Sequence, residues 1–230
     1  MTLSEAIEGL YVAFASRPRR ESIDGCPHCV GTEDQARLAR VPLRQLSSDQ
    51  LSRFAFKAMT TWGEPQDYAH FLPRILELSV HGAGLGLDLQ FVAQKLEYGH
   101  WRTWPAHEQR AVREVYEAAW REVLINAPDG RRASDLLQAL SMLFGELTPF
   151  LAEWEANRSL NSALLLAELL DEHWGELAKH GYLQRGPPIA PWLMDPARKE
   201  FLELEFEKQL GTPHADVLAK AIDSFQWFRA

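Results

Sequence analysis

The chain has 230 residues, of which 46% are hydrophobic and 24% charged, so it can bury a sizeable core and does not have the composition of a disordered protein. Its formal net charge is -8, and its one local basic cluster is RPRR at 17–20. Nucleic-acid binding depends on clustered cations, so we expect no nucleic-acid partner. No apolar run is long enough to cross a bilayer, and acidic residues stand where a secretory signal needs basic ones. We therefore expect a cytoplasmic protein without a membrane partner.

Apolar residues recur mostly at spacings of three and four, and sustained alternation is rare, which predicts an all-α protein. We expect a single domain over 1–230, built either as an irregular antiparallel helical bundle or as a short HEAT-like α-solenoid of about ten helices. In chain order, the predicted helices cover residues 3–15, 48–62, 66–81, 88–99, 105–125, 134–147, 149–157, 159–180, 191–209 and 213–228.

Several of these helices have a recognisable start. Threonine followed by proline, at 148–149 and 212–213, predicts two starts, because proline at the first helical position leaves no N–H unpaired. Pro73 complicates the helix at 66–81: either one helix ends and another begins there, or a single helix kinks. Three further starts carry a side chain whose oxygen can accept from a free amide of the first turn: Ser47 or Ser48, Asp88 and Ser134.

One helix and two connectors differ from the rest. The segment SALLLAELL, at 162–170, is apolar nearly all round, so we predict that it lies in the most buried helix. Most connectors are short, but 16–46 and 181–191 are longer. The first contains both cysteines of the chain, and the second is predicted to act as a hinge for the last two helices.

Cys26 and Cys29 stand within GCPHCVGTED, and their C-x-x-C spacing lets one tight turn present two thiolates to a tetrahedral zinc ion. Structural zinc takes four protein ligands, and the chain has no other cysteine. A zinc site would therefore recruit histidine or carboxylate. His70 is the first candidate for a further ligand, and His28 and His81 are others.

Two other interpretations of the cysteines stay open. CPHC resembles the active-site motif of the periplasmic thiol oxidases of the thioredoxin fold, which implies redox chemistry at Cys26 and Cys29. That family places the motif after a β-strand, whereas no strand is predicted before it here. In the third interpretation the segment is only a turn, and its thiols pack or remain free.

Two acid–histidine pairs have the spacing at which one helix face presents both side chains, Asp67 with His70 and Glu97 with His100. Helical di-iron proteins use Glu-x-x-His pairs that point into a bundle. One pair here has aspartate instead, and the other lies at a predicted helix end. Solvated helix faces are the simpler interpretation of both.

The segment HWRTWP places Trp101 and Trp104 beside a predicted helix start. Tryptophan is common at protein interfaces because a large ring buries much area with little loss of entropy, but it also fills cores. Trp101 and Trp104 are therefore candidates for a surface that binds a protein partner, with core packing as the alternative.

The segments DGCPHCV, VPLRQL, FAFKAMTTWG and YAHFLPRILEL together resemble a group of uncharacterised bacterial proteins. This resemblance implies a bacterial cytoplasmic protein and implies no activity. The residues themselves support three hypotheses. The first is a non-enzymatic helical scaffold or protein-interaction protein, the second a zinc-binding helical protein or enzyme that uses Cys26 and Cys29, and the third a thiol redox switch at CPHC.

Overall fold

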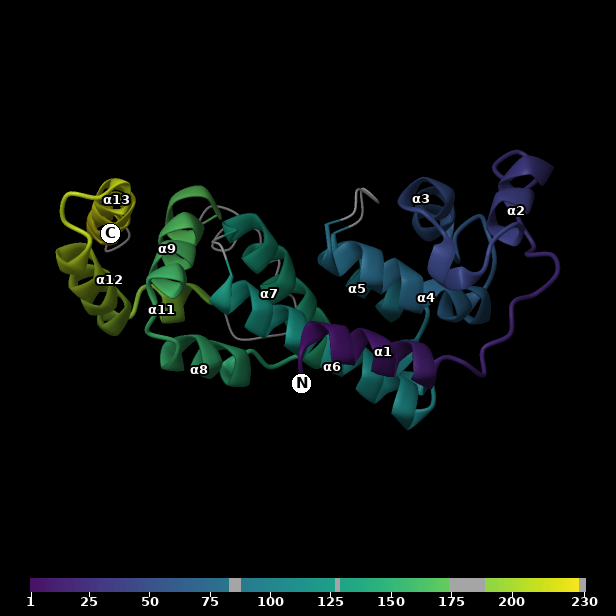
Figure 1. Cartoon of the computed structure of the whole chain (residues 1–230), viewed down its shortest axis with the longest axis horizontal. Helices are drawn as coiled ribbons and strands as arrows, with labels where there is room; N and C mark the ends of the chain where they lie inside the picture. The colour runs from purple at the N-terminus through teal and green to yellow at the C-terminus, as the bar shows by residue number, and fades with distance from the viewer. Residues whose placement is uncertain (83–87, 127–128, 174–188, 228–230) are drawn as a thin grey trace. The chain divides into compact units, whose positions relative to one another are not determined.

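The computed structural model describes residues 1–82, 88–126, 129–173 and 189–227 (Figure 1). These residues form helices and connectors, and the one extended pairing among them consists of isolated bridges from Trp62 to Gly25 and to Ala58. The all-α prediction is confirmed. The chain divides into two compact units, Met1–Ala118 and Ala119–Ala230, which the sequence did not predict. Their boundary lies inside a helix, where no loop signal marks it.

The first unit is arranged around a central helix. Its elements are α1 (Leu3–Ala13), α2 (Thr32–Ala39), the 3₁₀ turn η1 (Leu43–Gln45), α3 (Ser48–Lys57), α4 (Pro65–Val80), α5 (Leu89–Tyr98), the 3₁₀ turn η2 (Trp101–Thr103) and the greater part of α6 (Ala106–Ile125). α4 contacts α1, α3, α5 and η1, so it occupies the middle of the unit. Accordingly, most of its side chains are buried, among them Tyr68, Phe71, Leu72, Ile75 and Leu76.

α4 is one continuous helix, although Pro73 lies in its interior. Pro65 occupies its first turn, and the Asp67 carboxylate accepts a hydrogen bond from the Glu64 N–H at 2.8 Å. Pro73 has no N–H, so the Ala69 carbonyl lacks its helical donor. The stabilisation from the start signals and from burial of the long apolar face outweighs the loss of this one hydrogen bond. The choice left open at Pro73 is therefore settled in favour of a single helix.

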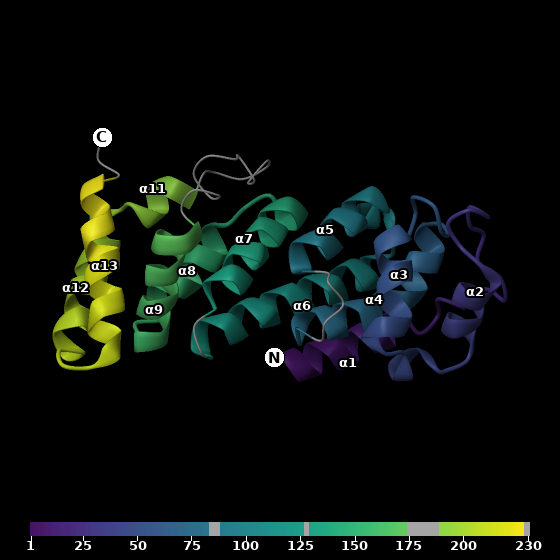
Figure 2. The same cartoon turned by 90° about the horizontal axis from the view of Figure 1, so that it is seen from above.

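The second unit contains the end of α6 and the remaining helices. They are α7 (Gly130–Phe144), α8 (Thr148–Ala156), α9 (Leu160–Glu168), the π-helical turn η3 (Leu169–His173), α11 (Ile189–Leu193), α12 (Pro196–Lys208) and α13 (Pro213–Trp227). α12 and α13 lie side by side in both views, and both contact α9 (Figure 2). Within 162–170 all residues except Glu168 are buried, in agreement with the prediction for this segment.

The structure corrects several predicted boundaries. The connector at 16–46 contains α2 and η1, and the single helix predicted at 191–209 is instead α11 and α12. Asp195 caps α12 by accepting from the Ala197 N–H at 2.8 Å, and Pro196 begins it. α7 begins at Gly130, capped by Asp129, and not at Ser134. Residues 174–188, which include most of the predicted hinge at 181–191, lie outside the described residues.

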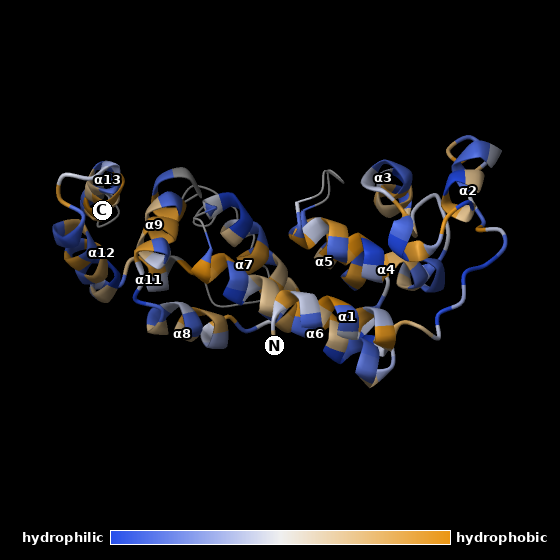
Figure 3. Ribbon diagram, in the orientation of Figure 1, coloured by the Kyte–Doolittle hydropathy of each residue, from blue (hydrophilic) through white to orange (hydrophobic). Residues whose placement is uncertain are grey.

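The helices combine hydrophilic and hydrophobic residues along their length, as Figure 3 shows. This pattern is expected of helices that bury one face against neighbours and expose the other. Among the helices that the structure describes, none is both long enough and apolar enough to span a membrane.

Candidate functional site

The segment that carries both cysteines is held against the connection between α3 and α4. The Cys26 N–H donates to the Thr61 carbonyl oxygen at 2.8 Å, and the Gly63 N–H donates to the Asp24 carbonyl oxygen at 2.6 Å. Gly63 has a φ of 71°, and a Cβ at this position would lie 2.8 Å from a methyl carbon of Ile23. Glycine is therefore needed for this close approach.

Cys26 and Cys29 lie in one tight turn, as their spacing predicts. The Cys26 carbonyl oxygen accepts from the N–H groups of Cys29, at 2.8 Å, and of Val30, at 2.9 Å. Pro27 suits this position because it has no N–H to be left unpaired. Both thiols are free and partly exposed. The turn thus brings two reduced sulfurs together at an accessible position.

The surroundings of Cys26 favour its thiolate form. The backbone N–H of His28 is the largest influence that lowers the pKa of the Cys26 thiol, and hydrogen bonds from the Cys29 thiol and N–H lower it further. The positive charge of Lys57 adds to this effect, whereas desolvation opposes it without reversing it. Because the thiolate is the form that attacks disulfides and binds metals, Cys26 has the features of a reactive cysteine.

Two cationic side chains of α3 reach the same turn. Lys57 Nζ and Arg53 Nη2 each donate to the Cys29 carbonyl oxygen at 2.9 Å. They stand four residues apart and so share one face of α3. Sequence reasoning missed both, because they lie 28 and 24 residues from Cys29 and no local pattern links them to it.

His70 is not part of this turn, contrary to the predicted ligand set of Cys26, Cys29 and His70. Its Nδ1 lies 2.7 Å from the Arg17 carbonyl oxygen, so its ring is turned toward the segment that follows α1. Among the described residues, no group of three or more His, Cys, Asp or Glu side chains could hold a metal ion. The structure therefore brings together the two cysteines and supplies no third ligand for zinc from the described part of this chain.

The two acid–histidine pairs serve structural contacts. Asp67 caps α4 and lies 3.5 Å from the Arg20 guanidinium, while its predicted companion His70 faces Arg17. Glu97 accepts from the Trp101 indole N–H at 2.7 Å and also pairs with Arg102. These partners explain both carboxylates without a di-iron site.

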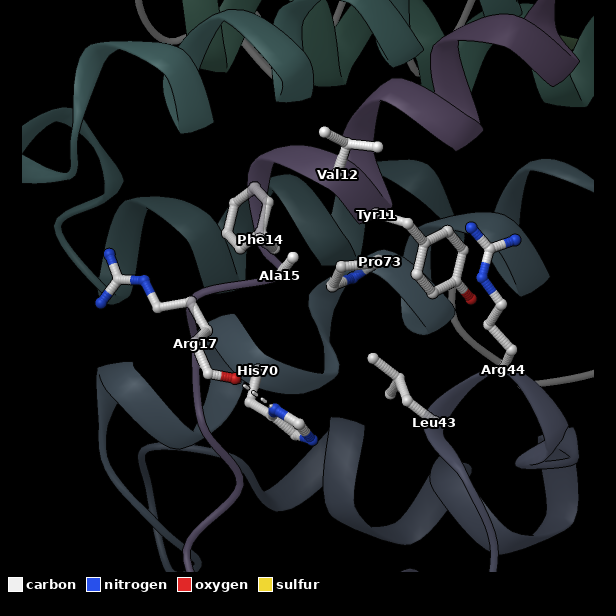
Figure 4. Close-up of a pocket in the computed structure, with 9 residues that line it drawn as sticks. All are labelled: Tyr11, Val12, Phe14, Ala15, Arg17, Leu43, Arg44, His70 and Pro73. Carbon is white, nitrogen blue, oxygen red and sulfur yellow. Dashed lines mark hydrogen bonds between the residues drawn. The ribbon is translucent and has the colours of Figure 1, made fainter.

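A second candidate site is an open cleft in the first unit, at the C-terminal end of α1 (Figure 4). Its volume is about 300 Å³. Among the described residues, its lining is mostly apolar, and its polar side chains are a tyrosine, two arginines and a histidine, with no carboxylate. The lining residues are Tyr11, Val12, Phe14, Ala15, Arg17, Leu43, Arg44, His70 and Pro73.

Tyr11 and Arg44 stack on one side of the cleft, and each has a carboxylate partner. The Arg44 guanidinium lies 3.8 Å from the centre of the Tyr11 ring and donates two hydrogen bonds to Glu8, at 2.6 and 2.7 Å. The Tyr11 hydroxyl donates to Glu77 at 2.6 Å, and burial with this hydrogen bond raises the pKa of Tyr11. Glu77 also pairs with Arg74 at 2.7 Å. Tyr11 therefore stays protonated at neutral pH, and its contacts with Arg44 and Glu77 restrict the rotation of its ring.

The His70 ring has one nitrogen, Nδ1, next to the Arg17 carbonyl oxygen, and its other nitrogen, Nε2, points away from that oxygen, as Figure 4 shows. A carbonyl oxygen can only accept, so Nδ1 must carry the proton that it donates to Arg17. Desolvation lowers the pKa of His70, and the hydrogen bond to Arg17 only partly offsets this effect. At neutral pH the ring is therefore uncharged, and Nε2 is a hydrogen-bond acceptor.

This pKa shift predicts a pH dependence of stability. The folded pKa lies below the unfolded value of about 6.5, so the unfolded chain binds more protons as the pH falls and the folded state loses stability. We expect the free energy of unfolding of the wild type to decrease more, between about pH 7.5 and about pH 5.5, than that of His70→Gln. Glutamine can still donate to Arg17 but does not titrate. Urea unfolding at several pH values measures the difference, and equal pH slopes would contradict it.

Trp101 and Trp104 are buried, with 4% and 9% of their surface exposed. Trp104 packs edge-on against Phe14, with ring centres 5.8 Å apart, and the Arg17 guanidinium lies 5.7 Å from its ring centre. Both rings therefore pack in the core of the first unit, and the predicted interaction surface on them is corrected. Except for His70, which was predicted as a metal ligand, the cleft residues were missed, because they come from α1 and the segment after it, from η1 and from α4 and share no motif.

The predicted resemblance to uncharacterised bacterial proteins remains a prediction. No family model, no curated protein and no solved structure matches the chain.

Proposed function

We propose that the protein is a helical protein-interaction module that binds a hydrophobic segment of a partner protein in the cleft beside α1. The observation that carries this proposal is the open, mostly apolar cleft of about 300 Å³. This volume is at the lower end of known ligand pockets, which span roughly 300–1,000 Å³, and it suits a few apolar side chains better than a large cofactor.

The exposure of Val12 supports a partner at this cleft. Val12 is 76% exposed although it belongs to α1, whose neighbouring residues Leu10 and Tyr11 are buried. Leu43 and Ala15 add partly or fully exposed apolar surface beside it. Single exposed apolar residues are common, but apolar residues gathered around a concave surface are typical of recognition sites.

The polar groups of the cleft define the chemistry of the bound segment. His70 Nε2 accepts, so it would take a backbone N–H or a hydroxyl from the partner. Arg44 is paired with Glu8 at the surface, and because exposed ion pairs are weak, Arg44 can exchange this partner for another carboxylate. We therefore propose a segment with an apolar side chain as its anchor and an acidic residue close to it.

A photo-crosslinking experiment tests this function. The crosslinking amino acid p-benzoylphenylalanine is placed at Val12, in the cleft, and at Val217, an exposed position of α13 in the second unit. In a cell lysate, we expect specific protein adducts from position 12 and none of the same adducts from position 217. Leu43→Glu should weaken adduct formation at position 12 by roughly tenfold, because it places a charge against the apolar anchor.

The matched control is Leu204→Glu, which adds the same charge at an exposed leucine of α12. It should leave the adducts at position 12 unchanged. Circular dichroism confirms that both variants remain folded. Identical adducts from positions 12 and 217, or adducts that survive Leu43→Glu in the folded protein, would contradict the proposed function.

A further inference from the structure

The cysteine turn is separate from the cleft, and its geometry is that of a vicinal dithiol. We propose that Cys26 and Cys29 form a reversible dithiol–disulfide couple that exchanges with low-molecular-weight disulfides. In this couple Cys26 attacks the incoming disulfide and Cys29 resolves the mixed disulfide that results. The inference does not depend on the proposed function, because no residue of the turn lines the cleft.

The first support is the placement of the two sulfurs. Two hydrogen bonds to the Cys26 carbonyl oxygen, from the N–H groups of Cys29 at 2.8 Å and Val30 at 2.9 Å, close the turn. The turn itself is anchored, because the Cys26 N–H is bonded to Thr61. The closed turn therefore keeps Cys29 beside Cys26, which lowers the entropic cost of bringing the two sulfurs together.

The second support is the asymmetry between the cysteines. Lys57 Nζ lies at this turn, 2.9 Å from the Cys29 carbonyl oxygen, and its charge, after the backbone N–H of His28 as the largest influence, lowers the pKa of the Cys26 thiol. An attacking thiol needs a sufficient thiolate fraction near ambient pH, and donors and cations provide it. Cys26 is therefore assigned the attack, and Cys29, whose carbonyl is held by Lys57 and Arg53, the resolving step.

The third support is access. Pro27 and His28, which separate the two cysteines, are exposed, and both thiols are partly exposed. A small disulfide such as oxidised glutathione can therefore approach the Cys26 sulfur from solvent. A buried structural cysteine would lack such a path, and its thiol would be inert.

The exchange balances with oxidised glutathione as the oxidant. The Cys26 thiolate attacks one glutathione sulfur, the glutathione S–S bond breaks, and one glutathione thiolate leaves and takes up a proton from solvent. Cys29 then loses its proton, and its thiolate attacks the Cys26 sulfur of the mixed disulfide. The second glutathione leaves as a thiol. Overall, two electrons and two protons pass from the protein dithiol to one glutathione disulfide, and reduced glutathione reverses the reaction.

The test uses the full-length protein and oxidised glutathione, followed by alkylation of free thiols and intact mass spectrometry. In the wild type we expect both free thiols to be lost and no glutathione to be retained. The product should be a monomer with a disulfide between Cys26 and Cys29. Cys29→Ser should stop with one glutathione attached to Cys26. Cys26→Ser should react at roughly one tenth of the rate of Cys29→Ser or more slowly, because the groups that favour a thiolate act on the Cys26 sulfur.

One lysine variant and one arginine variant separate the electrostatic effect of Lys57 on Cys26 from its structural role in holding the turn. Lys57→Gln and Arg53→Gln each remove a cation that donates to the same carbonyl oxygen. Only Lys57 contributes its charge to Cys26, so Lys57→Gln should slow glutathione attachment in the Cys29→Ser background by about threefold, and Arg53→Gln should slow it less.

Three results would overturn the proposal. In the first, the wild type keeps both thiols free in excess oxidised glutathione. In the second, Cys26→Ser and Cys29→Ser are modified at equal rates. In the third, the purified protein contains zinc at one ion per two chains, and the thiols react only after the metal is removed, which would mean that two copies share a four-cysteine site.

Discussion

Replacing Arg17 with methionine should lower the free energy of unfolding by about 3 kcal/mol or more. Arg17 donates from Nε and Nη2 to the two carboxylate oxygens of Glu108, at 2.7 and 2.6 Å. The Glu108 side chain is only 1% exposed, so the variant would leave a buried carboxylate without its counter-charge. Removing one partner of such a pair is far more destabilising than removing both, because the remaining buried charge has neither water nor a counter-charge around it.

Two further variants make this prediction specific. Glu108→Gln in the Arg17→Met background should recover a large part of the loss, since it removes the stranded charge. Arg44→Met removes an ion pair of similar geometry with Glu8, but both of those side chains are about half exposed, so the loss should be much smaller. Urea denaturation followed by circular dichroism measures all four proteins. Equal losses for Arg17→Met and Arg44→Met would show that burial of Glu108 does not have the expected effect.

Trp120→Ala should destabilise the second unit by roughly 3–5 kcal/mol. The Trp120 side chain is fully buried and packs edge-on against Trp154, with ring centres 5.5 Å apart. Its indole N–H donates to the Phe150 carbonyl oxygen at 3.1 Å, so alanine would leave a cavity and also remove this hydrogen bond.

Trp120→Phe separates the two effects, because it keeps most of the ring volume and removes only the donor. We expect the free energy of unfolding of Trp120→Phe to lie between those of Trp120→Ala and the wild type. Val217→Ala, at an exposed position of α13, is the control and should change stability by about 0.5 kcal/mol or less. Circular dichroism is the appropriate signal, since removing a tryptophan changes the fluorescence. A loss below about 1 kcal/mol for Trp120→Ala would mean that this core can collapse into the space left by the ring.

The sequence predicts helix positions well where a side chain caps its own helix. Ser47 and Asp88 accept from the N–H groups of Gln50 and Phe91, and their helices begin where expected. α2 was missed because Leu38 is its only buried residue, so its sequence TEDQARLA has almost no apolar pattern. The start of α7 was placed too late, since glycine after the capping aspartate is a poor helix former.

For the candidate sites as well, a local feature was predicted and the contacts between distant residues were not. The spacing of Cys26 and Cys29 is local and predicts their turn correctly. The orientation of His70 depends on a main-chain carbonyl of Arg17, 53 residues away, and a main-chain group has no signature in the sequence. Lys57 reaches the cysteine turn only because α3 packs beside it. Contacts of this kind follow from the tertiary structure and not from any motif.

The position of the unit boundary inside α6 restricts how the protein can be dissected. A fragment that ended at Ala118 would lose 119–125, whereas one that began at Ala119 would start with amides whose helical acceptors had been removed. Either cut would fray the same helix: the first fragment would lack Trp120, and in the second Trp120 would lie at the frayed end. Anyone who wishes to isolate the thiol-bearing half or its counterpart should therefore include all of 106–125 in each piece.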